Sequence, residues 1–421
     1  MGAGFAVWRT RVRRGSFAVL FGVGALLLVL HAALSPPAYA KDRQPARARA
    51  FRVFVERLWP EAKAHGVSRR TFDLAFARVT FDPKIIALTQ RQPEFVRPIW
   101  DYIAGAVSDA RVERGKEELE AYRPWLAKAQ QEYGVDPAVI IGIWGLETDF
   151  GAFTGSDNVI RSLATLAYAH FRGDYFRGEL IAALQILQEG DVAPAQMRGS
   201  WAGAMGQTQF MPSSFLQYAV DFEGHGRRDI WTSAPDAIGS TANYLKQEGW
   251  RGDEPWGLEV TLPKDFVLTV ADFLRYAPFG AFAGRGVRRA DGSALPESGE
   301  AELLVPSGLR GPIFLVTPNF KVIKTYNDST SYALAVAMLG DRATGGGPLV
   351  AAWPLRDRVL TMAQARDLQT RLKKKGYDVG DIDGKIGEAG QSALRAYQEK
   401  HGLTPDGYPT LALLQRLHKQ P

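Results

Sequence analysis

The sequence contains no cysteine among its 421 residues. This absence excludes disulfide bonds, thiol nucleophiles, thiolate metal sites and lipid attachment through an N-terminal cysteine. Histidine is scarce, and the six histidines show neither metal-ligand spacing nor a His-Glu-x-x-His motif. The glycines at 345–347 are followed by Pro348 rather than by a lysine-bearing helix, so no phosphate-binding loop is predicted. We therefore expect neither a metal nor a cofactor.

A strong excess of positive charge is also lacking once the N-terminus is set aside. Residues 1–40 contain four arginines and no acid. Without them, 47 of the 51 Lys and Arg residues face 45 Asp and Glu residues, and the net charge falls from +6 to +2. A basic surface for nucleic acid is therefore not predicted.

The first 40 residues have the pattern of a secretory signal. An arginine-rich start precedes a mostly apolar run from Phe17 to Leu34, and Ala38-Tyr39-Ala40 supplies a small-residue cleavage site. The alternative is an uncleaved membrane anchor, because about 18 apolar residues can just span a bilayer. We expect cleavage after Ala40 and a periplasmic protein with no stable membrane anchor. The remaining ~380 residues are enough to build a core without disulfides.

Periodicity and composition divide the rest of the chain into five regions. Helical patterns dominate to about Gly249, and short β-rich runs such as 266–270 and 313–316 follow between Gly and Pro turns. Helix returns at 331–339. Residues 341–354 are rich in glycine and predict a linker. The segment 355–421 then forms a compact helical unit in which Asp-Gly turns give a weak internal repeat.

One carboxylate, Glu147, stands out on a helix that is apolar nearly all round. Asp136-Pro137 opens this helix with an N-cap side chain and a proline at the first position. Glu147 lies in the last turn, on the face shared with Ile143 and Trp144. Apolar neighbours and the negative end of the helix dipole both raise the pKa of Glu147, as a general acid near neutral pH requires. The structural alternative is a capping carboxylate or one paired with a buried arginine.

A second catalytic carboxylate is not evident. Asp149 is the obvious candidate, but two residues along a helix point it away from Glu147. An ordinary acid–nucleophile pair is therefore not predicted from these two residues.

A glycine-rich polar segment at 199–214 completes the pattern. Gly199, Gly203 and Gly206 allow the backbone to approach a ligand closely. Short polar side chains in the same segment could serve the hydroxyls of a polysaccharide; they are Gln207, Gln209, Ser213 and Ser214.

Together these motifs resemble the lytic murein transglycosylase B family of peptidoglycan-cleaving enzymes over residues 50–340. The matching stretches are 144–151, 200–214, 236–245 and Tyr326-Asn327. The tail resembles the small three-helix peptidoglycan-binding domain, through Leu368-Gln369, Gly376-Tyr377, Asp383-Gly384, Tyr397-Gln398 and Asp406-Gly407 among others. The resemblance implies a mainly α, lysozyme-like catalytic core with a small β-containing segment at 41–340, followed by the linker and the binding domain at 355–421.

The resemblance also implies a reaction in which one Glu serves as acid and then as base. Glu147 would protonate the glycosidic oxygen and then take the proton of the muramoyl C6 hydroxyl, leaving a 1,6-anhydro sugar. Ser200 and Gln209 would line the subsites, while Tyr244 and Asn327 would approach Glu147 or the acetamido group beside Tyr326. Tyr102 is a further hypothesis with a poor local motif. Each tyrosine could equally be a packed aromatic, and Asn327 could serve a turn.

The loop at 221–236 predicts no calcium site. In relatives this loop can resemble an EF-hand, but here His225 and Arg227 stand where oxygen ligands are needed. The expected partner is the glycan strand of peptidoglycan, bound by a monomer. Two alternatives to a lytic transglycosylase remain open: a peptidoglycan-binding scaffold that does not cleave, and a hydrolytic muramidase whose second carboxylate comes from a distant loop.

Overall fold

Helices form most of the chain, as the periodicity predicts. The computed structural model describes residues 43–89 and 97–419, and the predicted signal at 1–40 lies outside the described residues. The helices that precede the main sheet are α1 (Arg43–Arg57), α2 (Trp59–Ala64), α3 (Arg69–Phe76), α4 (Pro83–Thr89), α5 (Ile99–Ala106), α6 (Asp109–Ala121), α7 (Arg123–Tyr133), α8 (Pro137–Thr148), α9 (Val159–Tyr168), α10 (Tyr175–Glu189), α11 (Pro212–Tyr218) and α12 (Ala234–Gln247). A two-stranded sheet pairs β1 (Asp157–Asn158) with β2 (Arg198–Gly199).

A small antiparallel sheet follows these helices. It has the order β4-β6-β7-β3-β5 and contains β3 (Gly257–Thr261), β4 (Ala277–Pro278), β5 (Arg288–Arg289), β6 (Glu300–Leu304) and β7 (Ile313–Val316). The 3-10 helix η2 (Val270–Phe273) and the helix α13 (Phe279–Gly284) lie between its strands in the chain. The strand predicted at 266–270 is wrong. Thr269 donates from its backbone N–H to the carboxylate of Asp272 at 2.8 Å and so caps η2 instead.

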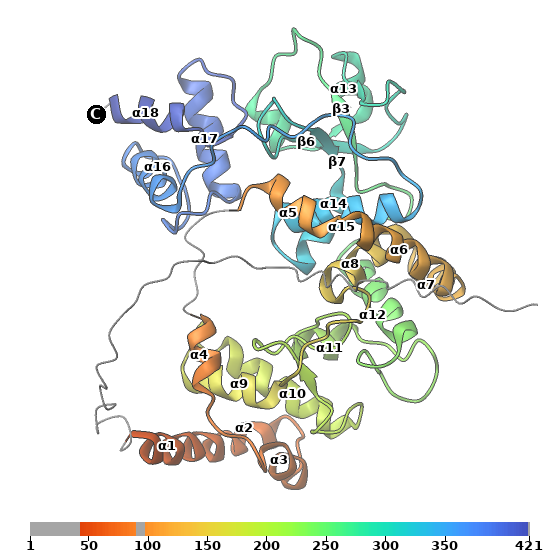
Figure 1. Cartoon of the computed structure of the whole chain (residues 1–421), viewed down its shortest axis with the longest axis vertical. Helices are drawn as coiled ribbons and strands as arrows, with labels where there is room; N and C mark the ends of the chain where they lie inside the picture. The colour runs from red at the N-terminus through yellow and green to blue at the C-terminus, as the bar shows by residue number, and fades with distance from the viewer. Residues whose placement is uncertain (1–42, 90–96, 420–421) are drawn as a thin grey trace, which may run out of the picture. The chain divides into compact units, whose positions relative to one another are not determined.

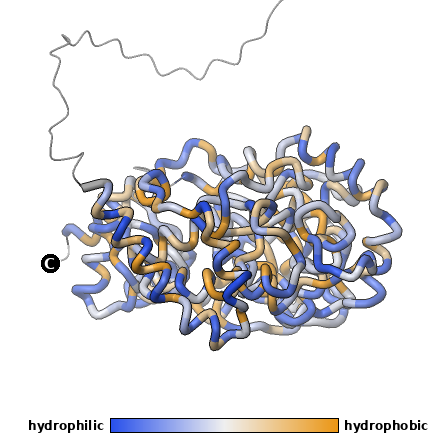
Figure 2. The backbone as a smooth tube through the Cα atoms, turned by 90° about the horizontal axis from the view of Figure 1, so that it is seen from below, coloured by the Kyte–Doolittle hydropathy of each residue, from blue (hydrophilic) through white to orange (hydrophobic). Residues whose placement is uncertain are grey.

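Two helices, α14 (Pro318–Tyr326) and α15 (Thr330–Ala343), return the chain to the main core. The C-terminal domain is built from α16 (Met362–Lys374), α17 (Glu388–Lys400) and α18 (Leu411–Lys419) (Figure 1). Its buried apolar residues form a core of their own. The predicted architecture is confirmed: mainly α, with a small sheet and a three-helix C-terminal unit. Hydrophobic and hydrophilic residues are interspersed along the backbone (Figure 2). Within the described ranges, no helix is both long and apolar enough to cross a membrane.

The internal repeat of the C-terminal domain has a clear physical basis. Gln369 on α16 accepts from the backbone N–H of Gly384 at 2.8 Å. Gln398 on α17 accepts from the backbone N–H of Gly407 at the same distance, 2.8 Å. Each Asp-Gly turn is therefore held by one buried helix glutamine.

The segment between α15 and α16 is held against the larger unit, by which we mean the described residues up to the end of α15. The backbone N–H groups of Val350 and Ala351 both donate to the carboxylate of Glu259 at 2.8 Å. Leu349 and Trp353 pack against the main core. The C-terminal domain is thus attached by a segment with its own tertiary contacts.

Helix α8 crosses α15 so closely that only glycine fits at two positions. A Cβ on Gly142 would lie 2.2 Å from the backbone oxygen of Val336, and one on Gly340 would lie 2.1 Å from that of Ala138. Both distances are far inside van der Waals contact. The close approach brings the N-terminal half of α15 beside the end of α8 that carries Glu147.

Gly340→Ala should lower the free energy of unfolding by about 3 kcal/mol, because the two helices must separate to admit the methyl group. Helix propensity alone predicts the opposite sign. The matched control is Gly178→Ala on α10, where an added Cβ meets nothing within 4 Å. Urea denaturation should show the control unchanged or stabilised, and a stabilised Gly340→Ala would contradict the close crossing.

Candidate active site

Glu147 ends the buried helix α8, as predicted. The carboxylate of Asp136 accepts from the backbone N–H of Ala138 at 2.9 Å and caps the helix start. The helix stops at Asp149, which adopts a positive φ of 52°. Glu147 itself is half-buried. Burial raises the pKa of Glu147 to about 7, and the hydrogen bond from Tyr332 opposes this rise. The direction expected from the sequence is confirmed.

Tyr332 is the direct partner of this carboxyl group. Its hydroxyl donates to Oε1 of Glu147 at 2.6 Å. The residue is the third in α15, where Ser329 caps the helix by accepting from the backbone N–H of Tyr332 at 3.3 Å. Sequence reasoning missed Tyr332, because it lies outside the Tyr326-Asn327 motif and 185 residues from Glu147. Its position six residues after Tyr326 was the only signal that pointed to it.

The charge of Glu147 also affects the pKa of two further tyrosines. Burial first, and then the nearby carboxylate, raise the pKa of Tyr102 on α5 and of Tyr326 at the end of α14. The same two causes raise the pKa of Tyr332. The hydroxyl of Tyr326 donates to the backbone oxygen of Thr208 at 2.7 Å. Of these three tyrosines, Tyr332 contacts the carboxyl group, and Tyr102 and Tyr326 lie within reach of its charge.

Tyr244 is a packing neighbour of Tyr326. Its ring packs against that of Tyr326 with centroids 4.8 Å apart, and against that of Tyr218 at 4.6 Å. Asn327 directly follows Tyr326 and is exposed. The roles of Tyr244 and Asn327 toward a substrate stay predictions.

Ser200 and Gln209 occupy the glycine-rich segment that follows β2. Ser200 closes a turn, because its hydroxyl oxygen accepts from the backbone N–H of Ala204 at 3.1 Å. The amide Nε2 of Gln209 donates to the backbone oxygens of Thr154 at 3.1 Å and of Gly206 at 2.9 Å. Gln209 thus joins this segment to the loop after α8. Its role in a subsite stays a prediction.

Two other polar residues of this segment have partners on neighbouring helices. Gln207 is buried, and its Oε1 accepts from the indole N–H of Trp144 at 3.0 Å. Ser213 is bonded through its hydroxyl to the carboxylate of Glu179 at 2.7 Å. Both residues hold the segment against neighbouring helices.

Asp149 is directed to arginines on α6 rather than to Glu147. Its carboxylate pairs with Arg111 at 3.2 Å and with Arg114. Among the residues that the structure describes, no carboxylate contributes to the pKa of Glu147. The prediction that Asp149 is not its partner is confirmed.

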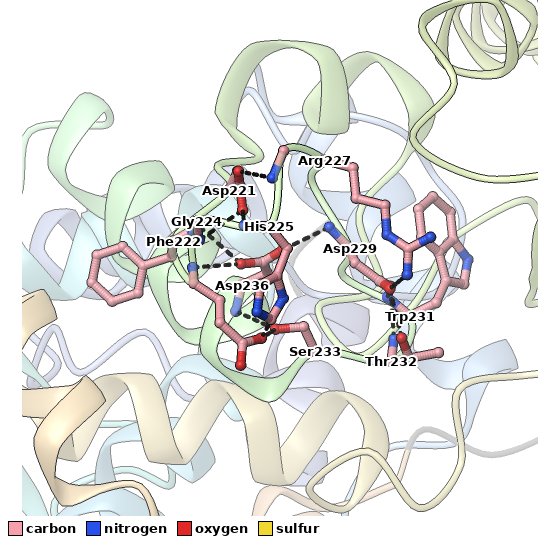
Figure 3. Close-up of polar contacts among 12 residues, drawn as sticks. Asp221, Phe222, Gly224, His225, Arg227, Asp229, Trp231, Thr232, Ser233 and Asp236 are labelled. Carbon is pink, nitrogen blue, oxygen red and sulfur yellow. Dashed lines mark hydrogen bonds and ion pairs between the residues drawn. The ribbon is translucent and has the colours of Figure 1, made fainter.

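The loop at 221–236 uses its carboxylates to bind its own backbone (Figure 3). Asp236 accepts from the N–H groups of Phe222 at 2.8 Å, Glu223 at 2.9 Å and Asp229 at 2.7 Å. Arg227 places its guanidinium against Asp229 at 2.9 Å. In the described part of the chain, no cluster of His, Cys, Asp and Glu suits a metal ion. His225 and Arg227 stand where a calcium ion would need oxygen ligands, and the absence of a calcium site stays a prediction.

Calcium should leave the Tm of this protein unchanged, since a bound ion would stabilise the fold by RT ln(1 + [L]/Kd). Calorimetry with calcium and with a chelator measures this directly. Asp236→Ala provides the contrast, because it leaves buried N–H groups without an acceptor and should cost about 3 kcal/mol. A Tm that rises with calcium would overturn the assignment of Arg227 and Asp236.

Two family models match the chain. One, described as "Transglycosylase SLT domain", covers residues 50–341, and the other, "Putative peptidoglycan binding domain", covers residues 361–417. A curated relative, the membrane-bound lytic murein transglycosylase B of Escherichia coli (strain K12), is 37% identical over 247 residues. The match covers 56% of this chain and 64% of that protein. The chain therefore spans less than two thirds of the length of this relative.

Solved structures share the fold. SltB3 from Pseudomonas aeruginosa, in complex with NAG-anhNAM-pentapeptide, is 47% identical with a TM-score of 0.82, over 87% of this chain and 99% of that one. Its complex with NAG-NAM-pentapeptide gives the same values. Slt35 from Escherichia coli, in complex with calcium, is 31% identical with a TM-score of 0.58, over 70% of this chain and 92% of that one.

Proposed function

The chain belongs to the transglycosylase SLT domain family, and from this we propose that it is a lytic transglycosylase of peptidoglycan. The bond cleaved is the β-1,4 linkage between N-acetylmuramic acid and N-acetylglucosamine. The peptidoglycan-binding domain model at 361–417 supports the same substrate. So do the SltB3 structures, which contain sugar–peptide fragments.

The observation that carries the proposal is the state of Glu147. A pKa of about 7 means that a large fraction of the carboxyl is protonated at neutral pH. The group can therefore donate a proton to the glycosidic oxygen as the C1–O bond breaks. The resulting carboxylate then takes the proton of the C6 hydroxyl, whose oxygen bonds to C1. The carboxyl returns to its starting state, no water is consumed, and a 1,6-anhydro end is formed.

Tyr332 suits a carboxyl group that must first donate a proton and then accept one. Its hydroxyl occupies Oε1, which leaves the other carboxyl oxygen for proton transfer. The hydrogen bond is strongest when Glu147 is ionised, so Tyr332 stabilises the charge that develops as the proton leaves. A pKa near the working pH balances the acid and base steps.

The remaining expectations belong to this proposal. Ser200, Gln209, Tyr244 and Asn327 would contact the sugar rings on either side of the scissile bond. Export through the segment 1–40, the periplasmic location and the monomeric state are predictions from the sequence.

Mass spectrometry of purified peptidoglycan digested by the protein tests the proposal. Products ending in 1,6-anhydromuramic acid are expected. Reducing ends, heavier by one water, would identify a hydrolytic muramidase. An uncut polymer that retains the protein would identify a binding scaffold.

A further inference from the structure

A cavity of about 590 Å³ lies where the C-terminal domain meets the larger unit. We call it the junction cavity. One wall is the start of α5 and the turn into α15, and the opposite wall is formed by residues 384–391 and 407–409 of the C-terminal domain. These parts can be followed in Figure 1 by the labels α5, α15 and α17. Its volume is in the usual range for pockets that bind small ligands.

The junction cavity is lined by residues that neighbour the candidate active-site residues in the chain. Trp100 lines it and lies on α5 two residues before Tyr102. Ser331 lines it and directly precedes Tyr332. Asp328 lines it and directly follows Asn327. The cavity is therefore lined by the same chain segments that carry Tyr102, Asn327 and Tyr332.

Positive charge is available at the mouth of the cavity. Arg97 and Lys385 both line it and are exposed, and within the described ranges neither forms an ion pair. Lys324 spans the two domains, paired with Asp328 at 3.2 Å and with Glu388. The N-termini of α15 and α17, with their positive dipole ends, open into the same space.

A buried arginine extends this positive region. Arg395 lines a smaller adjoining cavity of about 170 Å³ that shares Lys324, Thr330, Glu388 and Gln391 with the first. Its side chain lies over the ring of Phe273 at 4.1 Å, and the residue is only 7% exposed.

This guanidinium is incompletely satisfied. Its Nη2 donates to Oε1 of Gln391 at 3.4 Å, but no described group accepts a hydrogen bond from its Nε. Burial lowers the pKa of Arg395 to about 10. The carboxylates of Asp406, Glu302 and Glu388 act on its charge and raise its pKa, against the larger effect of burial. An anion that enters the smaller cavity would stabilise the buried guanidinium of Arg395.

We propose that the junction cavity binds the carboxylates of the peptide stem on the glycan strand being cleaved. This inference rests on the proposed function. A stem begins at the muramic acid ring beside the scissile bond and carries free carboxylates, whereas the sugar rings are uncharged. The C-terminal domain then forms part of the substrate site, because residues from both domains supply the cations.

The test compares glycan strands that keep their stems with strands from which the stems have been removed. The double variant Arg97→Glu/Lys385→Glu reverses both exposed cations. The ratio of kcat/KM for strands with stems to that for stripped strands should fall about tenfold, since charge-assisted hydrogen bonds are lost. The matched control is Lys373→Glu/Lys374→Glu, which makes the same charge change on the exposed face of α16, outside the cavity lining. An unchanged ratio in the cavity variant, or an equal fall in the control, would overturn the proposal.

Calorimetric binding to the full chain separates this site from the active site. The probe is a soluble stem tripeptide with free carboxylates, compared with its amidated form and with inorganic phosphate. Only the free tripeptide should bind, and Arg97→Glu/Lys385→Glu should weaken it about tenfold. Equal binding of the amidated tripeptide or of phosphate would overturn the assignment to stems. Strands that the wild type leaves uncut would instead refute the proposed function, while this binding measurement would still stand.

Discussion

Glu147→Gln should reduce the release of soluble glycan fragments by about 10³-fold or more. The amide keeps the shape of the side chain and can still accept from Tyr332, but it has no proton to transfer. Fragment release from insoluble peptidoglycan, followed by chromatography, measures the rate. The control is Asp149→Asn, which makes the same chemical change two residues away, where the carboxylate faces Arg111 and Arg114. Equal loss in both variants would contradict a single catalytic carboxyl group.

Glu147→Gln should also make the protein more stable than the wild type at alkaline pH. The folded pKa of Glu147, about 7, is above its ordinary value of 4.5. The wild type therefore loses stability as the pH rises from about 4.5 to about 7, because the buried carboxyl must ionise. Gln does not titrate. The free energy of unfolding of the variant should therefore exceed that of the wild type increasingly between pH 4.5 and about 7, toward an upper limit of about 3 kcal/mol. Unfolding at pH values on either side of the window measures it, and a variant no more stable at high pH would show that burial does not disfavour the charge.

Tyr332→Phe is expected to have the second largest effect. The hydrogen bond from Tyr332 lowers the pKa of Glu147, so its removal should raise that pKa further above its ordinary value. Activity that depends on the protonated acid falls as the pH rises through the pKa, and this falling limb should move to higher pH in the variant. The rate at its maximum should still drop about 10- to 100-fold, because the developing carboxylate loses its donor.

A pH–rate profile for each variant separates these two effects. Tyr218→Phe is the control, since Tyr218 belongs to the same aromatic group but bonds to Glu248. Its profile should keep the wild-type falling limb. A Tyr332→Phe enzyme with an unshifted limb would mean that the 2.6 Å hydrogen bond does not act on the reacting carboxyl group.

The candidate acid could be found from the sequence because its surroundings are local. Asp136, Pro137 and the apolar residues around Glu147 all belong to one helix, so capping and periodicity place the carboxyl in its buried last turn. Asp149 faces elsewhere because the helix ends there, where Asp149 has a positive φ and pairs with two arginines on α6. The C-terminal domain was also predictable, because its glutamines lie within 16 residues of the turns that they hold.

Partners that are distant in the chain could not be found in this way. Gln207 looked like a ligand-facing amide, but Trp144 on α8 uses it as an acceptor. Ser213 is similarly occupied by Glu179 on α10. The apolar run at 266–270 has strand composition, yet its Thr269 forms a cap with Asp272. In each case a hydrogen-bond partner fixes the conformation or the direction of the side chain, and residue composition does not identify that partner.

The helix that carries Glu147, the direction of its pKa shift and the order of the domains can be read from the residues alone, because short-range capping, periodicity and turns govern all three. The groups that surround the carboxyl, in contrast, depend on how distant segments pack. The close crossing of α8 and α15 at Gly142 and Gly340 brings Tyr332 to Glu147 across 185 residues. Likewise, only the packing of the C-terminal domain brings Lys385 into one cavity with Arg97. These contacts depend on how helices pack, and packing is a property of the whole chain rather than of any segment.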